Sequence, residues 1–152
     1  MTTTSTPTAP STVNGRVIAL AHYAGRAILE TALARRGLTF QQTVTLRPAA
    51  TAGTPVERDE LIGQVVDALK VDPTEVRGTI EELIVKGLLA PAASRLRITD
   101  AGQAIYAEVG AETAPISARI YAGIPAEDLA TAGRVLTLVT ERANAESAAL
   151  SR

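Results

Sequence analysis

The stretch from Asp72 to Gly102, DPTEVRGTIEELIVKGLLAPAASRLRITDAG, constrains the fold more than any other part of the chain. It opens with Asp72-Pro73-Thr74-Glu75, which gives a helix an N-cap, a proline at its first position and an acidic first turn. Apolar residues then recur at helical spacing until Lys86-Gly87 ends the helix. Two short apolar pieces and a new helix start at Thr99 follow. A helix, a short hairpin and a second helix start form the second half of a winged helix-turn-helix.

The segment before it predicts the first half. Thr54-Pro55-Val56-Glu57 repeats the same cap pattern, so we expect a helix that begins there. Its core face carries apolar side chains at Leu61, Ile62, Val65, Val66 and Leu69. A tight turn at Val71 separates it from the next helix. Two capped helices joined by such a turn predict a helix-turn-helix.

Long helices are expected on both sides of this unit. One spans 13–36 and carries two apolar stripes. A capping box of Thr39 and Gln42 opens a shorter helix that runs to about Ala49. After the hairpin, Thr99 starts a helix that we expect to bend near Pro115 and to end at about residue 122. The last helix has one face formed by Leu129, Leu136, Val139 and Ala143. Terminal helices with wide apolar faces favour a twofold dimer.

The chain is therefore expected to be mainly α, with one domain over 14–152. Residues 14–37 and 103–150 would form dimerisation helices, and 38–102 the winged helix-turn-helix. The first thirteen residues are rich in Thr, Ser and Pro and carry no charged side chain, which predicts a disordered tail rather than a secretory signal. No apolar run is expected to approach the roughly 20 residues of a membrane span. These features favour a cytoplasmic protein.

The charge distribution argues against tight binding of nucleic acid. Residues 55–100 hold six basic and nine acidic side chains, and they are the most acidic part of the chain. Basic contacts to phosphates normally supply a large share of affinity for DNA. Only four aromatic residues are present, which disfavours a binder that stacks on exposed bases.

The order and spacing of these motifs resemble the MarR family of dimeric winged-helix transcriptional regulators, over about 14–149. The matching segments are Leu38-Thr39 with Gln42, Glu60-Leu61-Ile62, Asp72 through Leu83 with Lys86-Gly87-Leu88-Leu89, Leu96 through Gly102, and Ile120 through Leu129. The resemblance implies a homodimer, a recognition helix in the major groove of a palindromic operator, and a pocket for a small phenolic or aromatic effector. The DNA-contacting positions that it implies on this helix are Thr74, Glu75, Arg77, Gly78 and Thr79.

Arg77 is the strongest candidate for a base contact, because a guanidinium can bond both O6 and N7 of guanine. A structural alternative is an intrahelical ion pair with Glu81, four residues on. The family's wing usually carries an arginine for the minor groove, whereas the wing tip here is uncharged at 91–94. Arg95 and Arg97 follow it as candidate substitutes. We expect them to alternate across the strand, so that at most one faces DNA directly.

His22, Tyr23 and Arg26 are the candidate ligand-binding residues. His22 and Arg26 lie one helical turn apart and are able to hold an anionic or phenolic oxygen. The alternative is that His22 is simply a packed or surface residue. Arg35 and Arg36 are interpreted as complements of a helix C-terminus. Tyr106 and Tyr121 are interpreted mainly as helix-packing residues.

No cofactor and no metal site is expected. The chain has no cysteine and a single histidine, which excludes thiolate zinc sites and leaves only carboxylates as further ligands. No nucleophile triad, phosphate loop or carboxylate pair supports a named reaction, although His22 would be the acid/base candidate of an enzyme. Three functions stay open: a ligand-responsive regulator, a protein of this fold that has lost DNA binding and uses its pocket for binding or catalysis, and a protein-interaction module.

Overall fold

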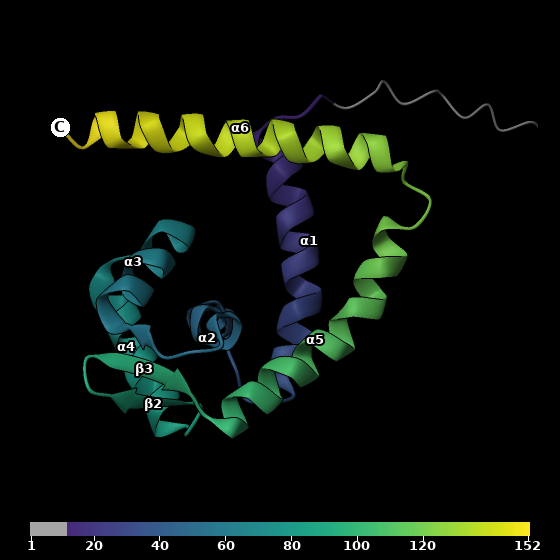
Figure 1. The fold of residues 1–152 in the computed structure, drawn as a ribbon. Coiled ribbons are helices and arrows are strands. Elements are labelled where there is room, and N and C mark those ends of the chain that lie inside the picture. Colours follow the sequence, from purple (N-terminus) through teal and green to yellow (C-terminus); the bar gives the residue numbers. More distant parts are fainter. Residues whose placement is uncertain (1–11) are drawn as a thin grey trace, which may run out of the picture. The chain divides into compact units, whose positions relative to one another are not determined.

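The computed structural model describes residues 12–152, so most of the predicted 1–13 tail lies outside the described residues. The chain divides into two compact units, with the boundary after Ala114. The first unit holds five helices, the last one in part, and a three-stranded sheet (Figure 1). Helix α5 (Asp100–Tyr121) continues past the boundary, and α6 (Ala126–Leu150) lies in the second unit. The fold is mainly α, as predicted, whereas the single domain over 14–152 stays a prediction.

The first two helices begin at side-chain caps. The Asn14 side chain accepts the Val17 N–H at 3.0 Å and starts α1 (Gly15–Ala34). The predicted capping box is present at α2 (Phe40–Ala52), where Thr39 accepts the Gln42 N–H at 3.1 Å and Gln42 accepts the Thr39 N–H at 3.1 Å. Helix α2 continues through Pro48 beyond the expected end at Ala49, and stops at Gly53 with φ of 71°.

The predicted helix start at Thr54 was wrong. Val56 and Glu57 form strand β1 (Val56–Glu57), antiparallel to strand β3 (Arg95–Ile98), with Val56 opposite Leu96 and Glu57 opposite Arg95. Helix α3 (Arg58–Leu69) begins only after it, without a side-chain cap. Pairing with a distant strand therefore overrides the local cap pattern.

The helix-turn-helix itself is confirmed. Helix α3 ends at Lys70, which takes a left-handed conformation with φ of 56°. Asp72 then caps α4 (Pro73–Val85) by accepting the Thr74 N–H at 2.8 Å. This hydrogen bond is the main reason why the pKa of Asp72 lies below its usual value, and the positive charge of Arg77 lowers it further.

The hairpin, called the wing below, is longer than predicted. Strands β2 (Leu89–Ala92) and β3 (Arg95–Ile98) pair in antiparallel register, with Leu89 opposite Ile98. Ala93 and Ser94 form the turn, and Ala93 adopts a φ of 56°. The sheet order β1-β3-β2 places β3 in the middle.

The core of the first unit lies where α2, α3, α4 and the sheet meet. Its fully buried apolar side chains are all aliphatic, as the scarcity of aromatic residues requires: Leu33, Leu46, Leu61, Val65, Val76, Ile80, Leu83, Leu89 and Leu96. Thr99 caps α5 by accepting the Gly102 N–H at 3.0 Å. Gly102 packs directly against the Leu88 carbonyl oxygen, leaving no space for a Cβ atom. This contact fixes the start of α5 on the wing.

The second unit, Pro115–Arg152, contains the end of α5, a turn at Gly123 and α6. Glu127 and Asp128 lie in the first turn of α6, as predicted. Helix α6 has 25 residues, and none is buried. Four apolar side chains in its middle, Val135, Leu136, Leu138 and Val139, are each about 40% exposed.

Helix α1 is, between residues 12 and 152, the one helix long and apolar enough to cross a membrane by length and composition alone. This corrects the expectation that no segment approaches that character. The observation is weak evidence for a span, because a helix buried in a protein core has the same composition.

Candidate nucleic-acid interface and ligand cavity

Four of the five predicted recognition positions are exposed on α4: Thr74, Glu75, Arg77 and Gly78. Thr79 is only 6% exposed. Its hydroxyl accepts a hydrogen bond from Gln41 Nε2 at 3.0 Å and donates one to the Glu75 carbonyl oxygen at 3.0 Å. Thr79 therefore connects α4 to α2 and does not reach the surface.

Arg77 does not form the intrahelical pair considered above. Glu81 instead accepts a hydrogen bond from Arg58 Nη1 on α3 at 3.1 Å. Within the part of the chain that the structure describes, Arg77 makes no ion pair. Its guanidinium is exposed and available to an external anion or base.

In the wing, the predicted alternation of Arg95 and Arg97 was wrong. Residues two apart on a strand point to the same face. Both arginines are exposed on one face of β3, while Leu96 between them is fully buried on the other.

Arg95 lies next to the wing turn and is held there by Glu57 of β1, because its Nε donates to Glu57 Oε1 at 2.7 Å. Ser94 Oγ donates to the second oxygen of this carboxylate at 3.0 Å. These two hydrogen bonds lower the pKa of Glu57, and the bond from Arg95 has the larger effect. Arg97 makes no ion pair among residues 12–152, so it is the freer of the two arginines.

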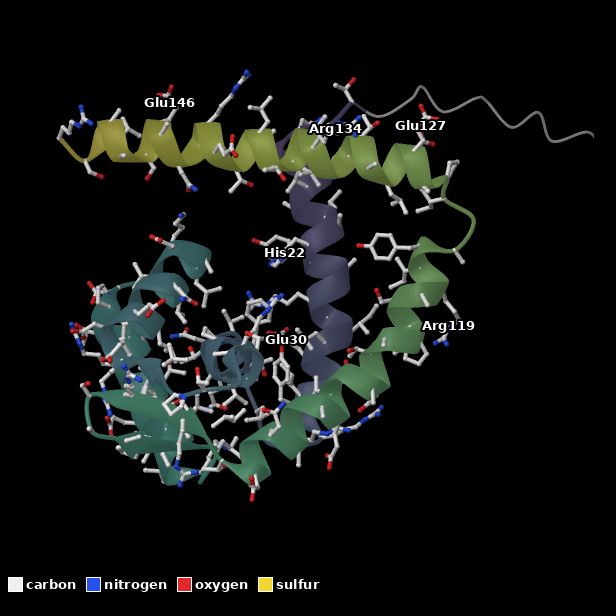
Figure 2. The ribbon with its side chains drawn as sticks, in the orientation of Figure 1. His22, Glu30, Arg119, Glu127, Arg134 and Glu146 are labelled. Carbon is white, nitrogen blue, oxygen red and sulfur yellow. The ribbon has the colours of Figure 1, made fainter. Side chains whose placement is uncertain are left out.

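The three predicted ligand residues lie on α1, and two of them gather around Phe40 of α2. The Arg26 guanidinium stacks over the Phe40 ring at 4.1 Å and pairs with Glu30 at 3.1 Å. The His22 ring stands edge-on to Phe40 with 6.1 Å between centroids. Figure 2 shows His22 and Glu30 projecting from α1. Tyr23 is 63% exposed and contacts the ring of His22.

Arg26 also lines a groove of about 490 Å³ between α1, α2 and α4. The groove includes Glu75 and Gly78 of α4, but neither His22 nor Tyr23 lines it. Since Glu30 already neutralises Arg26, the predicted trio does not form a free anion site in this structure.

A second cavity, of about 330 Å³, lies between α1, α2 and α5 and was missed from the sequence. Its lining is mainly apolar: Leu29, Phe40, Thr43, Val44, Arg47, Tyr106, Val109, Gly110 and Thr113. Thr43 Oγ1 is buried and has no hydrogen-bond partner within the described residues. A buried hydroxyl without a partner costs free energy, so this oxygen is a local weak point of the packing around the cavity. The available signal was the helical spacing of Phe40, Thr43, Val44 and Arg47 on α2.

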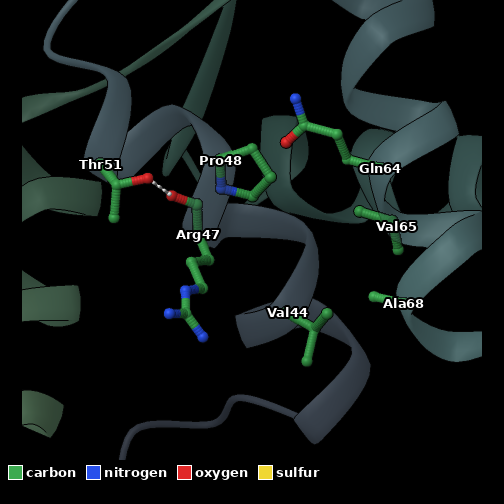
Figure 3. Close-up of a pocket in the computed structure, with 7 residues that line it drawn as sticks. All are labelled: Val44, Arg47, Pro48, Thr51, Gln64, Val65 and Ala68. Carbon is green, nitrogen blue, oxygen red and sulfur yellow. Dashed lines mark hydrogen bonds between the residues drawn. The ribbon is translucent and has the colours of Figure 1, made fainter. Parts of the chain in front are cut away.

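A shallower groove of about 290 Å³ adjoins the other side of α2, against α3 (Figure 3). Its lining residues are Val44, Arg47, Pro48, Thr51, Gln64, Val65 and Ala68. Val44 and Arg47 are thus shared with the α1–α2–α5 cavity.

The middle of α5 is attached to the end of α1 by ion pairs. Arg36 Nη1 donates to Glu112 Oε2 at 2.6 Å and to the Ala32 carbonyl oxygen at 2.9 Å, and Arg35 also bonds to Glu112. The bond to Ala32 fits the predicted role at the helix C-terminus, whereas the ion pairs were not foreseen. The hydrogen bond from Arg36 is the main reason why the pKa of Glu112 is lowered.

Comparison with known proteins identifies the fold. No family model matches the chain. CouR from Rhodococcus jostii RHA1, bound to p-coumaroyl-CoA, is similar with a TM-score of 0.70 at 19% identity, over 83% of this chain and 90% of that protein. MarR from E. coli has a TM-score of 0.65 at 17% identity, over 86% and 95% of the two chains. The Mycobacterium tuberculosis MarR family protein Rv2887, in complex with DNA, has a TM-score of 0.62 at 21% identity, over 85% and 98%. The chain therefore has the MarR winged-helix fold.

Part of the sequence also resembles a segment of a longer protein. A segment of 72 residues, 46% of this chain, is 38% identical to the trifolitoxin operon protein TfxC of Rhizobium leguminosarum bv. trifolii. The match spans only 20% of the length of TfxC.

Proposed function

We propose that the protein is a homodimeric transcriptional regulator that binds a palindromic operator and responds to a small effector, acting in the cytoplasm. The proposal rests mainly on the position and exposure of the Arg77 side chain. It is exposed near the start of the second helix of the helix-turn-helix and makes no ion pair among residues 12–152. An arginine in that position is suited to read a guanine in the major groove. The solved DNA complex of Rv2887, which has the same fold, supports this role for α4.

The proposed DNA-contacting set is Thr74, Glu75, Arg77 and Gly78 on α4, with Arg97 and Arg95 at the wing. Thr79 is left out because it is buried against Gln41. Two of the acidic side chains that would repel phosphates are already paired, Glu81 with Arg58 and Glu57 with Arg95. The electrostatic objection is therefore smaller than the sequence suggested.

The homodimer is supported by apolar surface in each unit. On α1, Leu20 is 56% exposed, and α6 carries a row of partly exposed apolar side chains without a single buried residue. Large exposed apolar surfaces of this kind are typical of subunit interfaces. Sedimentation equilibrium at micromolar concentration should give twice the chain mass, and a monomer would contradict this part of the proposal.

The α1–α2–α5 cavity is the proposed effector site. Its apolar lining and the guanidinium of Arg47 suit a small aromatic or phenolic acid. CouR, with the same fold, binds p-coumaroyl-CoA, which supports an effector of aromatic character. His22, Tyr23 and Arg26 do not line this cavity, and their role in ligand binding stays a prediction.

Selection from a random-sequence DNA pool, with affinity measured over a range of salt concentrations, tests DNA binding. We expect an enriched palindrome and an affinity that falls steeply as salt rises. Absence of enrichment at low salt would overturn the regulator and favour the alternative below.

The alternative is a protein of the same fold that has lost DNA binding and uses its cavity for a small molecule. Two observations favour it: the wing tip at 91–94 is uncharged, and Arg95 is engaged by Glu57. The match to TfxC, a protein of much greater length, adds that related sequence also occurs within a larger chain. Ligand binding without any enriched DNA sequence would distinguish this alternative from the regulator.

A further inference from the structure

We propose that the ligand site continues across α2 from the α1–α2–α5 cavity into the α2–α3 groove, and that it takes an amphipathic anion with an apolar group on each side of its negative charge. This inference rests on the proposed effector site and extends it with a second chamber and a ligand class.

The two chambers lie on neighbouring faces of α2. The cavity is lined on α2 by the stripe 40, 43, 44 and 47, and the groove by the stripe 44, 47, 48 and 51. Each stripe has the spacing of one helix face. The second is displaced from the first by four residues, about one turn or 5–6 Å along the axis. The two chambers are therefore neighbours that share Val44 and Arg47.

The charged residues around the two chambers favour an anionic ligand. Arg47 is the one ionisable cation in the described lining of both chambers, and no acidic side chain lines either of them. It is also the one charged residue in α2, and it makes no ion pair among residues 12–152. Figure 3 shows its side chain extending from α2 at the edge of the groove. A negative group bound at the shared boundary would be matched by this guanidinium.

Apolar side chains lie on both sides of Arg47. On one side lie Leu29, Phe40 and Val109, and on the other lie Pro48, Val65 and Ala68. With volumes of about 330 and 290 Å³, each chamber alone is at the small end of ligand sites. Hence one chamber fits a single aromatic ring system, and both together fit a ligand with two apolar parts.

Two probes with the same anionic group test the inference. 1-Anilinonaphthalene-8-sulfonate has two aromatic groups beside its sulfonate, whereas naphthalene-1-sulfonate has one. Isothermal titration of the full chain, without DNA, should show about tenfold tighter binding of the two-armed probe. Ala68→Leu, which fills the α2–α3 groove, should abolish this difference, while Ala104→Leu on the exposed surface of α5 should preserve it. Arg47→Gln should weaken both probes about tenfold, whereas Arg119→Gln should leave both unchanged.

Equal affinity for the two probes, no binding of either, or a difference that survives Ala68→Leu would overturn the second chamber. Unchanged affinity in Arg47→Gln would overturn the anion site. DNA enters none of these titrations, so failure of the DNA-pool selection and failure of the second chamber are separate results. If only the one-armed probe binds with a dependence on Arg47, the effector cavity stands and its extension does not.

Discussion

The amide of Gln42 on α2 donates from Nε2 to Glu82 Oε2 on α4 at 2.9 Å, in a position where Gln42 is only 5% exposed. The same amide accepts the Thr39 N–H through Oε1, so one side chain both starts α2 and ties it to α4. The neighbouring Gln41 adds a second bond to α4 through Thr79. The other face of α2 lines the proposed effector cavity. Helix α2 is thus the direct connection between the cavity and the proposed recognition helix.

Gln42→Ala should lower the free energy of unfolding by about 1–2 kcal/mol, because it removes half of a capping box and a buried hydrogen bond. Urea unfolding followed by circular dichroism measures this. Gln103→Ala, at an exposed site on α5, is the matched control and should change stability by less than about 0.5 kcal/mol. Equal stability of the two variants would show that the Gln42 bonds contribute nothing.

Gly102→Ala should destabilise the protein by about 1–3 kcal/mol, since its Cβ would overlap the Leu88 carbonyl oxygen and lie 2.8 Å from Ile98 Cγ1. Gly63→Ala on α3 meets no atom within 4 Å and should be neutral or stabilising by up to about 1 kcal/mol. Thermal unfolding of both variants makes the comparison. A Gly102→Ala protein as stable as Gly63→Ala would mean that α5 does not start against the wing as described.

Thr43→Val should stabilise the ligand-free protein by about 1 kcal/mol, because the buried hydroxyl has no partner among the described residues and a methyl group needs none. Chemical unfolding tests the sign. A loss of stability would mean that Thr43 Oγ1 is already satisfied, for instance by water.

Stability should fall in acid through the ion pairs of Glu112. Its pKa is lowered in the folded protein, chiefly by the hydrogen bond from Arg36. A carboxyl group with a lowered folded pKa stabilises the protein fully above its unfolded pKa of about 4.3, and this contribution is lost as pH falls through the folded value. Melting temperatures between pH 6 and pH 2 should therefore fall less steeply in Glu112→Gln than in the wild type. Parallel curves would contradict the attachment of α5 to α1 by this carboxylate.

The sequence predicted those elements whose signals are local. Asp72 before Pro73 and the Thr39–Gln42 box define helix starts through residues only a few positions apart, and both are present in the structure. The strand at Val56 was missed because its partner, Leu96, lies forty positions away and no local pattern encodes that pairing. Arg35 and Arg36 were predicted to complement a helix C-terminus. Their ion pairs with Glu112 were missed for the same reason, because Glu112 follows more than seventy positions later.

The candidate site was less predictable than the fold. Arg77 was identified because its place in a helix-turn-helix is set by local spacing. The cavity needs Phe40, Thr43 and Tyr106 from two helices that are distant in the sequence, and its clearest mark is the unsatisfied hydroxyl, which only packing shows. His22 was predicted to bind the ligand as the one histidine of the chain, yet its ring packs on Phe40 and does not line that cavity.

If α4 reads DNA through Arg77, loss of this guanidinium must weaken binding and change base preference. Binding of the enriched duplex is compared by fluorescence anisotropy in the wild type, Arg77→Ala and Arg119→Ala, at several salt concentrations. We predict that Arg77→Ala costs about 1–3 kcal/mol and relaxes the base preference at one position of each half-site, while Arg119→Ala binds like the wild type. Wild-type affinity and base preference in Arg77→Ala would contradict the claim.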